Sequence, residues 1–223
     1  MSTRFMFHSA GTSPLDTLGF DSQWGTTTGA VRLPMDVRNL MSAPTALADA
    51  VLSIANTGTQ QNLHTQFVSN QIFKPIRITT DDWVSCIIRC FEDVIGVDAH
   101  LAMRVRGVSA VDGRELGGVF ASSMATLTEL ATTAATRLIG NNAATIACSA
   151  VTINEPWRMV FELGVHLVTP AAGSVTMRPG CNAASDFAFT SALTTDLNPW
   201  WVFSRDLDAL PAGFQHLRGF NIG

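Results

Sequence analysis

Charged side chains are scarce in this 223-residue sequence. Asp, Glu, Lys and Arg make up 14% of it, against about 25% in an ordinary soluble domain. Apolar residues make up 47%, so the exterior must consist largely of Thr, Ser, Asn, Ala and Gly. A weakly charged surface is poorly protected against association, which favours a protein whose faces are covered by neighbours in an assembly. A neutral monomer with a Thr-rich surface is the alternative.

Clustered basic residues, long apolar runs and a secretory signal are also missing. The 14 basic residues are scattered and the net charge is −4, which argues against binding to a phosphate backbone. No apolar run approaches the roughly 20 residues that span a bilayer. The N-terminal segment lacks the apolar core of a secretory signal. We therefore expect synthesis in a cytoplasm, with neither nucleic acid nor a membrane as partner.

Motifs that carry catalysis are absent as well. The sequence contains no GxSxG elbow, HExxH helix, phosphate-binding glycine loop or dinucleotide fingerprint. The five histidines form no local metal pair; His100 and His166 lie on the polar faces of two expected strands, where ordinary imidazoles are favoured over a metal site. The acidic pairs Asp81–Asp82 and Glu92–Asp93 fit turn chemistry, with the opposed carboxylates of a glycosidase as the alternative. We expect no enzymatic activity, no cofactor and no metal.

Cysteine is rare, and its spacing excludes a zinc-type pair. The four residues are Cys86, Cys90, Cys148 and Cys181. Cys86 and Cys90 lie on one face of an expected strand, about 13 Å apart, whereas a disulfide requires Cα atoms within about 7 Å. We interpret all four as small buried apolar groups.

The dominant pattern that is present is alternation of apolar and polar residues, which predicts β-strands. In residues 157–168, Trp157, Phe161 and Leu163 fall on one face, and Glu162 falls on the other. Residues 98–107 alternate in the same way, which is typical of antiparallel strands with one buried face. Residues 83–92 are apolar on both faces apart from Arg89, which predicts a central strand covered on each side.

Short strands separated by Gly, Asn, Asp or Pro favour an all-β fold, an antiparallel β-sandwich or jelly roll of about ten strands. It includes at most one or two short helices. One is expected after Ser42, where Leu47, Val51 and Ile54 recur at helical spacing. Residues 124–140 are open between helix, strand and loop, because their Thr residues lower helix propensity. Further strands are expected at Arg4–His8, Leu63–Val68, Ile76–Thr80, Leu116–Ala121, Ala144–Thr152, Val175–Arg178 and Trp200–Ser204.

No internal repeat and no Pro-rich or Gly/Ser-rich linker divides the chain, so we expect a single domain over residues 1–204. Residues 39–61 form a long loop or short helical insertion within it. Residues 205–223 lack a strand pattern but are rich in Leu and Phe. This C-terminal extension must dock on its own domain or on a neighbour, because exposed aromatic side chains are unfavourable in water.

Seven segments follow one another along the chain: RFMFHSAGTSP, Phe20 with Trp24, HTQFVSNQI, VSCIIRCFED, DAHLAMRVRGVSAVDGRELGGVF, WRMVFELGVHL and DLNPWWVFS. In this order they resemble a family of β-sandwich proteins encoded in tailed-bacteriophage genomes and regarded as virion components. The resemblance covers nearly the whole chain up to Ser204 and rests on strand motifs without a binding or catalytic signature. The sequence departs from the family between Asn39 and Gln61, where it is longer, and after Ser204.

The resemblance implies a phage structural protein. The weakly charged surface favours a capsid decoration protein, also called a cement protein, that binds the major capsid protein. We expect it also to bind copies of itself and to form a trimer or other small homo-oligomer. Its place would be the outer surface of the capsid. The first strand, RFMFH, could pair with a neighbour's sheet edge. The alternative is a tail, baseplate or fibre module that binds host carbohydrate through Trp83, Trp200 or Trp201. The interface candidates are Phe5, Phe7, Trp24, Phe214 and Phe220.

Overall fold

The computed structural model describes residues 2–15, 18–37, 46, 48–55, 58–123, 129–133, 135–139, 145–168, 171–180 and 199–207. A single turn of 3-10 helix, η2 (Ile95–Val97), accompanies the strands in this part of the chain. The strands are β1 (Thr3–Phe7), β2 (Val31–Val37), β3 (Ala50–Ile54), β4 (Gln60–Ser69), β5 (Ile76–Ile78), β6 (Trp83–Glu92), β7 (Ala99–Ser109), β8 (Glu115–Ser123), β9 (Ala135–Ile139), β10 (Ile146–Ala147), β11 (Val151–Ile153), β12 (Trp157–Leu167), β13 (Gly173–Arg178) and β14 (Trp200–Phe203).

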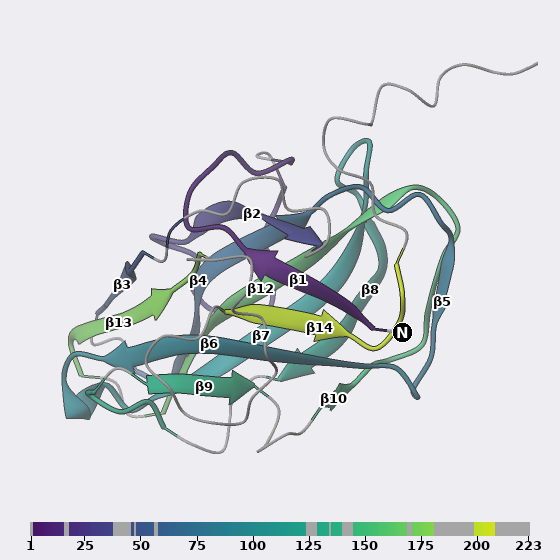
Figure 1. The fold of residues 1–223 in the computed structure, drawn as a ribbon. Helices are drawn as coiled ribbons and strands as arrows, with labels where there is room; N and C mark the ends of the chain where they lie inside the picture. The colour runs from purple at the N-terminus through teal and green to yellow at the C-terminus, as the bar shows by residue number, and fades with distance from the viewer. Residues whose placement is uncertain are drawn as a thin grey trace, which may run out of the picture.

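Among the described residues, twelve strands form one large sheet. Their order is β3-β13-β6-β14-β1-β2-β4-β12-β7-β8, with β9 and β10 also paired to β6. The pairs are antiparallel except for β2 with β4, and β5 and β11 form a separate two-stranded sheet. The large sheet folds over on itself, so that β1, β14 and β6 lie in front of β4, β12 and β7 (Figure 1). The predicted all-β, mainly antiparallel sandwich is confirmed.

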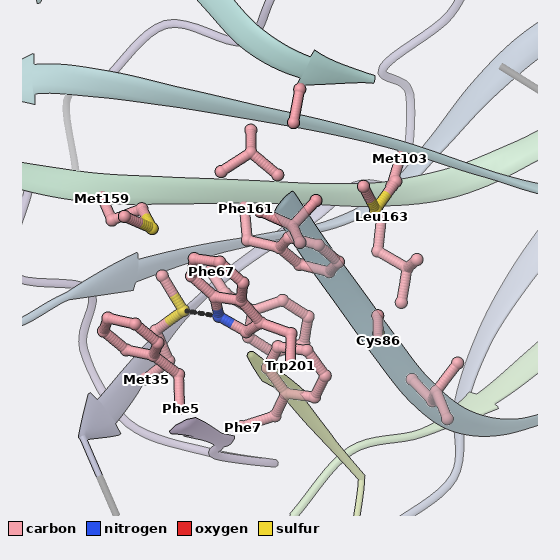
Figure 2. Close-up of a cluster of buried hydrophobic side chains, with 14 of the residues drawn as sticks. Phe5, Phe7, Met35, Phe67, Cys86, Met103, Met159, Phe161, Leu163 and Trp201 are labelled. Atoms are coloured by element: carbon pink, nitrogen blue, oxygen red, sulfur yellow. Dashed lines mark hydrogen bonds between the residues drawn. The ribbon is translucent and has the colours of Figure 1, made fainter. Parts of the chain in front are cut away.

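Side chains from both layers meet in the main core. Trp201 of β14 stacks on Phe5 of β1 at 4.5 Å between ring centroids and on Phe161 of β12 at 5.3 Å. Its indole N–H donates to the sulfur of Met35 at 3.0 Å (Figure 2). The predicted alternation of β12 is confirmed, because six alternate side chains enter this core: Trp157, Met159, Phe161, Leu163, Val165 and Leu167.

The central position predicted for β6 is also confirmed. β14 and β13 pair with successive stretches of one edge, and β9 pairs with the opposite edge. Cys86 and Cys90 face the main core, while Ile87 packs on the other face with Met6 and Trp200. Cys86, Cys90 and Cys148 are buried free thiols, as expected. Burial raises the pKa of Cys86 well above its ordinary value, so it remains a neutral apolar group; Cys181 lies outside the described residues.

The helix expected after Ser42 is wrong for its second half, because Ala50–Ile54 is the strand β3. Val51 is 62% exposed while its neighbour Leu52 is 4% exposed, which is the two-residue period of a strand. β3 pairs with β13, more than 100 residues away, and such a partner overrides a weak local helical spacing. Residues 135–139 of the open segment 124–140 also form a strand, β9, against β6.

The strand β2 was not among the expected strands, although its side chains alternate between buried and partly exposed. Leu33, Met35 and Val37 are buried, with Pro34 between them. Proline lacks the N–H that a ladder requires and is therefore unexpected in a strand with two neighbours. Here the Pro34 carbonyl still accepts a hydrogen bond from the amide of His8 at 3.2 Å. The strand joins the two layers, because β1 lies on one side of it and β4 on the other.

Gly164 marks an irregularity where β12 changes register with β4. A Cβ atom at this position would collide with the carbonyl oxygen of Asn62 and would lie 2.7 Å from the Trp24 ring. We expect Gly164→Ala to lower the free energy of unfolding by about 1 to 3 kcal/mol, because a backbone carbonyl cannot move aside. Urea denaturation measures the loss.

The matched control for this substitution is Gly19→Ala. A Cβ at Gly19 would meet nothing within 4 Å, so the expected change is within about 0.5 kcal/mol. Equal stability of the two variants would contradict the close approach of Asn62 and Trp24 to β12.

Candidate functional site

The outer face of β4, β12 and β7 is covered by the segment between β1 and β2. Leu15 and Leu18 of this segment pack against Val68 and Val160. Trp24 packs on Leu63 of β4 and Ala102 of β7. The face that alternation predicted to be polar is therefore an interior surface, and Leu15 with residues 18–24 forms a third layer over it.

A buried carboxylate, Glu162 of β12, lies at the centre of this interface. Its side chain is fully buried. One oxygen accepts from Gln66 Nε2 at 2.8 Å and from Arg106 Nη2 at 2.9 Å. The other accepts from the indole N–H of Trp24 at 2.7 Å, and the Asp21 amide donates to both oxygens at 3.1 and 3.2 Å. We call these five residues the Glu162 cluster.

Further polar contacts bind the covering segment to the strands. Arg104 forms an ion pair with Asp21 at 3.2 Å, and Arg106 also donates to the Gly19 carbonyl. Gln66 Nε2 donates to the same carbonyl at 3.1 Å. Two carboxylates thus face two guanidinium groups beneath the segment, so their charges balance. Buried charges are tolerated only when they are paired and hydrogen-bonded in this way.

The arrangement suits a structural clamp and leaves little room for chemistry. A carboxylate has about four lone-pair positions, and the donors around Glu162 already occupy both oxygens. A general acid or base needs an oxygen within reach of a substrate proton. Alternation predicted that Glu162 lies on the polar face but did not reveal the cluster. The signal in the sequence was charged residues on one face of two strands: the register places Glu162 directly opposite Arg104, and Arg106 lies two residues further along the same face of β7.

A second carboxylate, Glu92, closes the connection between β6 and β7. Glu92 is fully buried; its Oε2 accepts from the Ala99 amide at 3.2 Å, while its Oε1 has no hydrogen-bond partner. Burial raises the pKa of Glu92; the Ala99 amide opposes this rise, and the negative charges of Glu129, Asp98 and Asp93 add to it. Folding therefore shifts Glu92 toward its protonated form relative to the unfolded chain.

This raised pKa predicts a pH-dependent stability. The folded protein holds the Glu92 proton more tightly than the unfolded chain, so this contribution is complete below the unfolded pKa and is lost as pH rises through the folded pKa. We expect Glu92→Gln, which stays neutral, to gain stability relative to wild type between pH 4 and pH 8. Urea midpoints across that range measure the difference.

Glu155→Gln serves as the control, because the Glu155 side chain is 41% exposed and pairs with an exposed Arg114. The difference in unfolding free energy between Glu155→Gln and wild type should change little over the same pH range. A wild-type protein that becomes more stable than Glu92→Gln as pH rises would contradict the account.

The acidic pair Asp81–Asp82 was interpreted as turn chemistry, and Asp82 confirms it. Asp82 Oδ2 accepts from the Thr79 amide at 2.8 Å, and Asp82 Oδ1 accepts from Arg205 at 2.6 Å. Burial alone would raise the pKa of Asp82, but hydrogen bonds from Arg205, Thr79 and Ser204 outweigh it and lower the pKa. Asp82 therefore fixes the turn and the end of β14 together.

The first residues of the C-terminal extension dock on their own domain. The Thr3 amide donates to the Arg205 carbonyl at 2.8 Å, and the Leu207 amide donates to Thr3 Oγ1 at 2.7 Å. Leu207 is buried. Residues 208–223, which include the interface candidates Phe214 and Phe220, lie outside the described residues.

The interface candidates in the described chain are core residues, which corrects the expectation that they are free to contact a neighbour. Phe5 and Phe7 are 0% exposed, and Phe7 stacks on Phe67 at 4.2 Å. Trp24 is 6% exposed and belongs to the Glu162 cluster. Strand β1 pairs with β14 on one edge and β2 on the other, so it offers no edge to another sheet. An aromatic residue in the sequence alone does not indicate whether its side chain lies in the core or at an interface with another protein.

The proposed carbohydrate platform is also largely internal. Trp200 and Trp201 are at most 1% exposed, and the Arg4 guanidinium lies over the Trp200 ring at 4.9 Å. Trp83 is partly buried and packs against the apolar cluster that contains Trp200. Two of the three indoles are therefore unable to stack on a sugar, and the core interpretation of Trp200 and Trp201 is confirmed.

His100 and His166 do become neighbours, because β7 and β12 pair them directly. His100 Nε2 lies 3.6 Å from Asp98 Oδ1. Within the described residues, however, no group of three or more His, Cys, Asp or Glu side chains is arranged to hold a metal ion. The same part of the chain contains no helix of the length and hydropathy needed to cross a membrane.

Comparisons with known proteins yield a likeness of fold without a family. No protein-family model and no curated protein matches the sequence. The structure is similar to a CocE/NonD family hydrolase from Staphylococcus aureus, with 9% identity and a TM-score of 0.46 over 91% of this chain and 36% of that one. A structure of infectious bursal disease virus, Gx strain, aligns with 13% identity and a TM-score of 0.25 over 84% of this chain and 41% of the viral chain. The chain therefore spans well under half of either protein, and neither likeness carries an inference about activity.

Proposed function

We propose that this chain is a structural protein of a tailed-bacteriophage particle, a decoration or cement protein that binds the major capsid protein and stabilises the shell. In this proposal it acts without catalysis, cofactor or metal, sits on the capsid surface as a small homo-oligomer, and is made in the host cytoplasm. The resemblance to the phage family supports a structural protein of the virion. The scarcity of charged residues supports a protein whose surface is covered by neighbours in an assembly.

The observation that carries the proposal is the pairing of buried charged groups between the covering segment and the sheet. The carboxylate and guanidinium groups of the Glu162 cluster and Arg104 form ion pairs and hydrogen bonds across the interface between the covering segment and the sheet. Such pairs fix a single arrangement of the layers. A preformed, rigid surface is what repeated binding on a regular shell requires, because little ordering entropy is then lost at each contact.

The test compares particles with and without this protein. We expect particles that lack it to release their genome at a lower temperature, and to survive osmotic shock less often, than particles to which purified protein has been added back. Calorimetry and a DNA-release dye measure both effects. Unchanged shell stability in its absence would reject the cementing role.

A matched control separates binding from folding. Val111 lies in an exposed turn and is 85% exposed, so Val111→Ser should fold normally. If Val111→Ser no longer binds particles, the turn after β7 is part of the contact. If added Val111→Ser protein stabilises particles as well as wild type does, the assay is insensitive to a surface change outside the contact.

A further inference from the structure

One end of the sandwich combines exposed aliphatic side chains with carboxylates. Ile95 is 80% exposed, Val94 is 45% exposed and Val168 is 44% exposed. These three are half of the large exposed apolar residues in the described chain. Exposed aliphatic residues gathered at one place mark a contact surface more often than scattered ones do.

The loops that carry these side chains are held together by backbone hydrogen bonds. The Val168 amide donates to the Asp98 carbonyl at 3.2 Å, and the Ala171 amide donates to the Gly96 carbonyl at 2.9 Å. The Asp93 side chain accepts from the Ser174 amide at 2.6 Å. Residues 93–98 and the described residues Val168, Ala171 and Ala172 therefore lie side by side, and we call this surface the 93–98 end.

Negative charge surrounds the aliphatic side chains, and the His100 imidazole, 3.6 Å from Asp98, is the basic group beside it. Asp93 and Glu129 are exposed, and the Asp98 side chain is 30% exposed. No Lys or Arg occurs in residues 90–103, 129–133 or 168–173. The potential over this end is therefore negative, and it attracts a positively charged partner.

We propose that the 93–98 end is a docking surface for a protein segment that carries Arg or Lys on either side of an aliphatic side chain. The aliphatic residue would contact Ile95 and Val94, and the cationic groups would reach Asp93 and Glu129. A metal ion fits less well, because the carboxylates do not converge into a coordinating group. Long, flexible cationic side chains reach separate carboxylates. The inference uses this chain's surface alone and does not depend on a virion role.

The test titrates the full chain with three synthetic peptides, Ac-GRLRLRG-amide, Ac-GRSRSRG-amide and Ac-GELELEG-amide, and follows backbone amide shifts by NMR. We expect the first peptide alone to bind, to shift amides of residues 93–98 and 168, and to bind more weakly as NaCl is raised, because exposed charges are screened. Equal binding of the second peptide would overturn the aliphatic part of the proposal, and equal binding of the third would overturn the charge part.

Two variants and one control locate the contact. Ile95→Ser should weaken binding about tenfold or more, because a buried aliphatic contact is lost, and Asp93→Asn with Glu129→Gln should remove most of the salt dependence. Val111→Ser removes an equally exposed aliphatic side chain after the other end of β7 and should leave binding unchanged. Binding that survives Ile95→Ser, or self-association of the chain that Ile95→Ser abolishes, would overturn the proposed partner.

Discussion

Glu162→Gln is expected to lower the free energy of unfolding by about 3 to 5 kcal/mol, because the buried Arg106 guanidinium loses its buried counter-charge and keeps only the partly exposed Glu115 carboxylate at 3.5 Å. Four groups donate to this carboxylate, from Asp21, Trp24, Gln66 and Arg106. An amide keeps the shape of the side chain but turns one acceptor into a donor that faces other donors. Urea denaturation followed by circular dichroism measures the loss.

The control for this variant is Glu155→Gln. The ion pair of Glu155 with Arg114 is shorter, at 2.6 Å, but its side chains are 41% and 58% exposed. Exposed pairs contribute at most about 1 kcal/mol. Hydrogen exchange adds a local readout: Glu162→Gln should speed exchange at Asp21 and at the Trp24 indole more than in β6. A Glu162→Gln protein as stable as Glu155→Gln would contradict the clamp.

Trp201→Ala is expected to destabilise the protein by about 3 to 5 kcal/mol through the cavity it leaves. The indole is 0% exposed and is stacked between Phe5 and Phe161 (Figure 2). Because these rings come from both layers of the sandwich, the cavity opens where the layers meet. Thermal unfolding of purified protein measures the effect.

Trp83→Ala provides the matched control, since Trp83 is only partly buried and its loss should cost less. If Trp201→Ala does not fold, Trp201→Phe retains a ring and should lose about 1 to 3 kcal/mol. A smaller loss for Trp201→Ala than for Trp83→Ala would contradict the assignment of Trp201 to the centre of the core.

Local patterns were sufficient to predict most of the strands that form the two layers, but β2 and β3 were not among them. The alternation of Trp157, Met159 and Phe161 specified which face of β12 enters the core, and it does. The double-sided apolar run around Ile87 and Ile88 specified a central strand, and β6 is paired on both edges. In each case the two-residue period of the strand determines burial within the segment itself.

The Glu162 cluster could not be predicted in the same way, because its contacts join distant parts of the chain. Asp21 and Trp24 lie 141 and 138 residues from Glu162. Alternation predicts that Glu162 and Arg106 point away from the main core, but it says nothing about a loop that covers them. The strand β3 illustrates the same limit, because its partner β13 lies far along the sequence and outweighs the local helical spacing of Val51 and Ile54.

The aromatic residues show why interface candidates were misplaced. Phe5, Phe7 and Trp24 were chosen because aromatic anchors dominate many interfaces, but the same property makes them core residues when strands on either side are available. Their exposure depends on β14, β2 and the covering segment, whose pairing is set by the tertiary fold. The exposed Ile95, by contrast, lies in a short connection where nothing in the described chain covers it.

The most direct test of the structural role is to locate the protein on purified phage particles by cryo-electron microscopy, with a small tag fused to the chain. The proposal predicts density for the 223-residue chain on the outer face of the shell, in a fixed ratio to the major capsid subunits. Label confined to the tail tip, or particles that contain none of the protein, would contradict it.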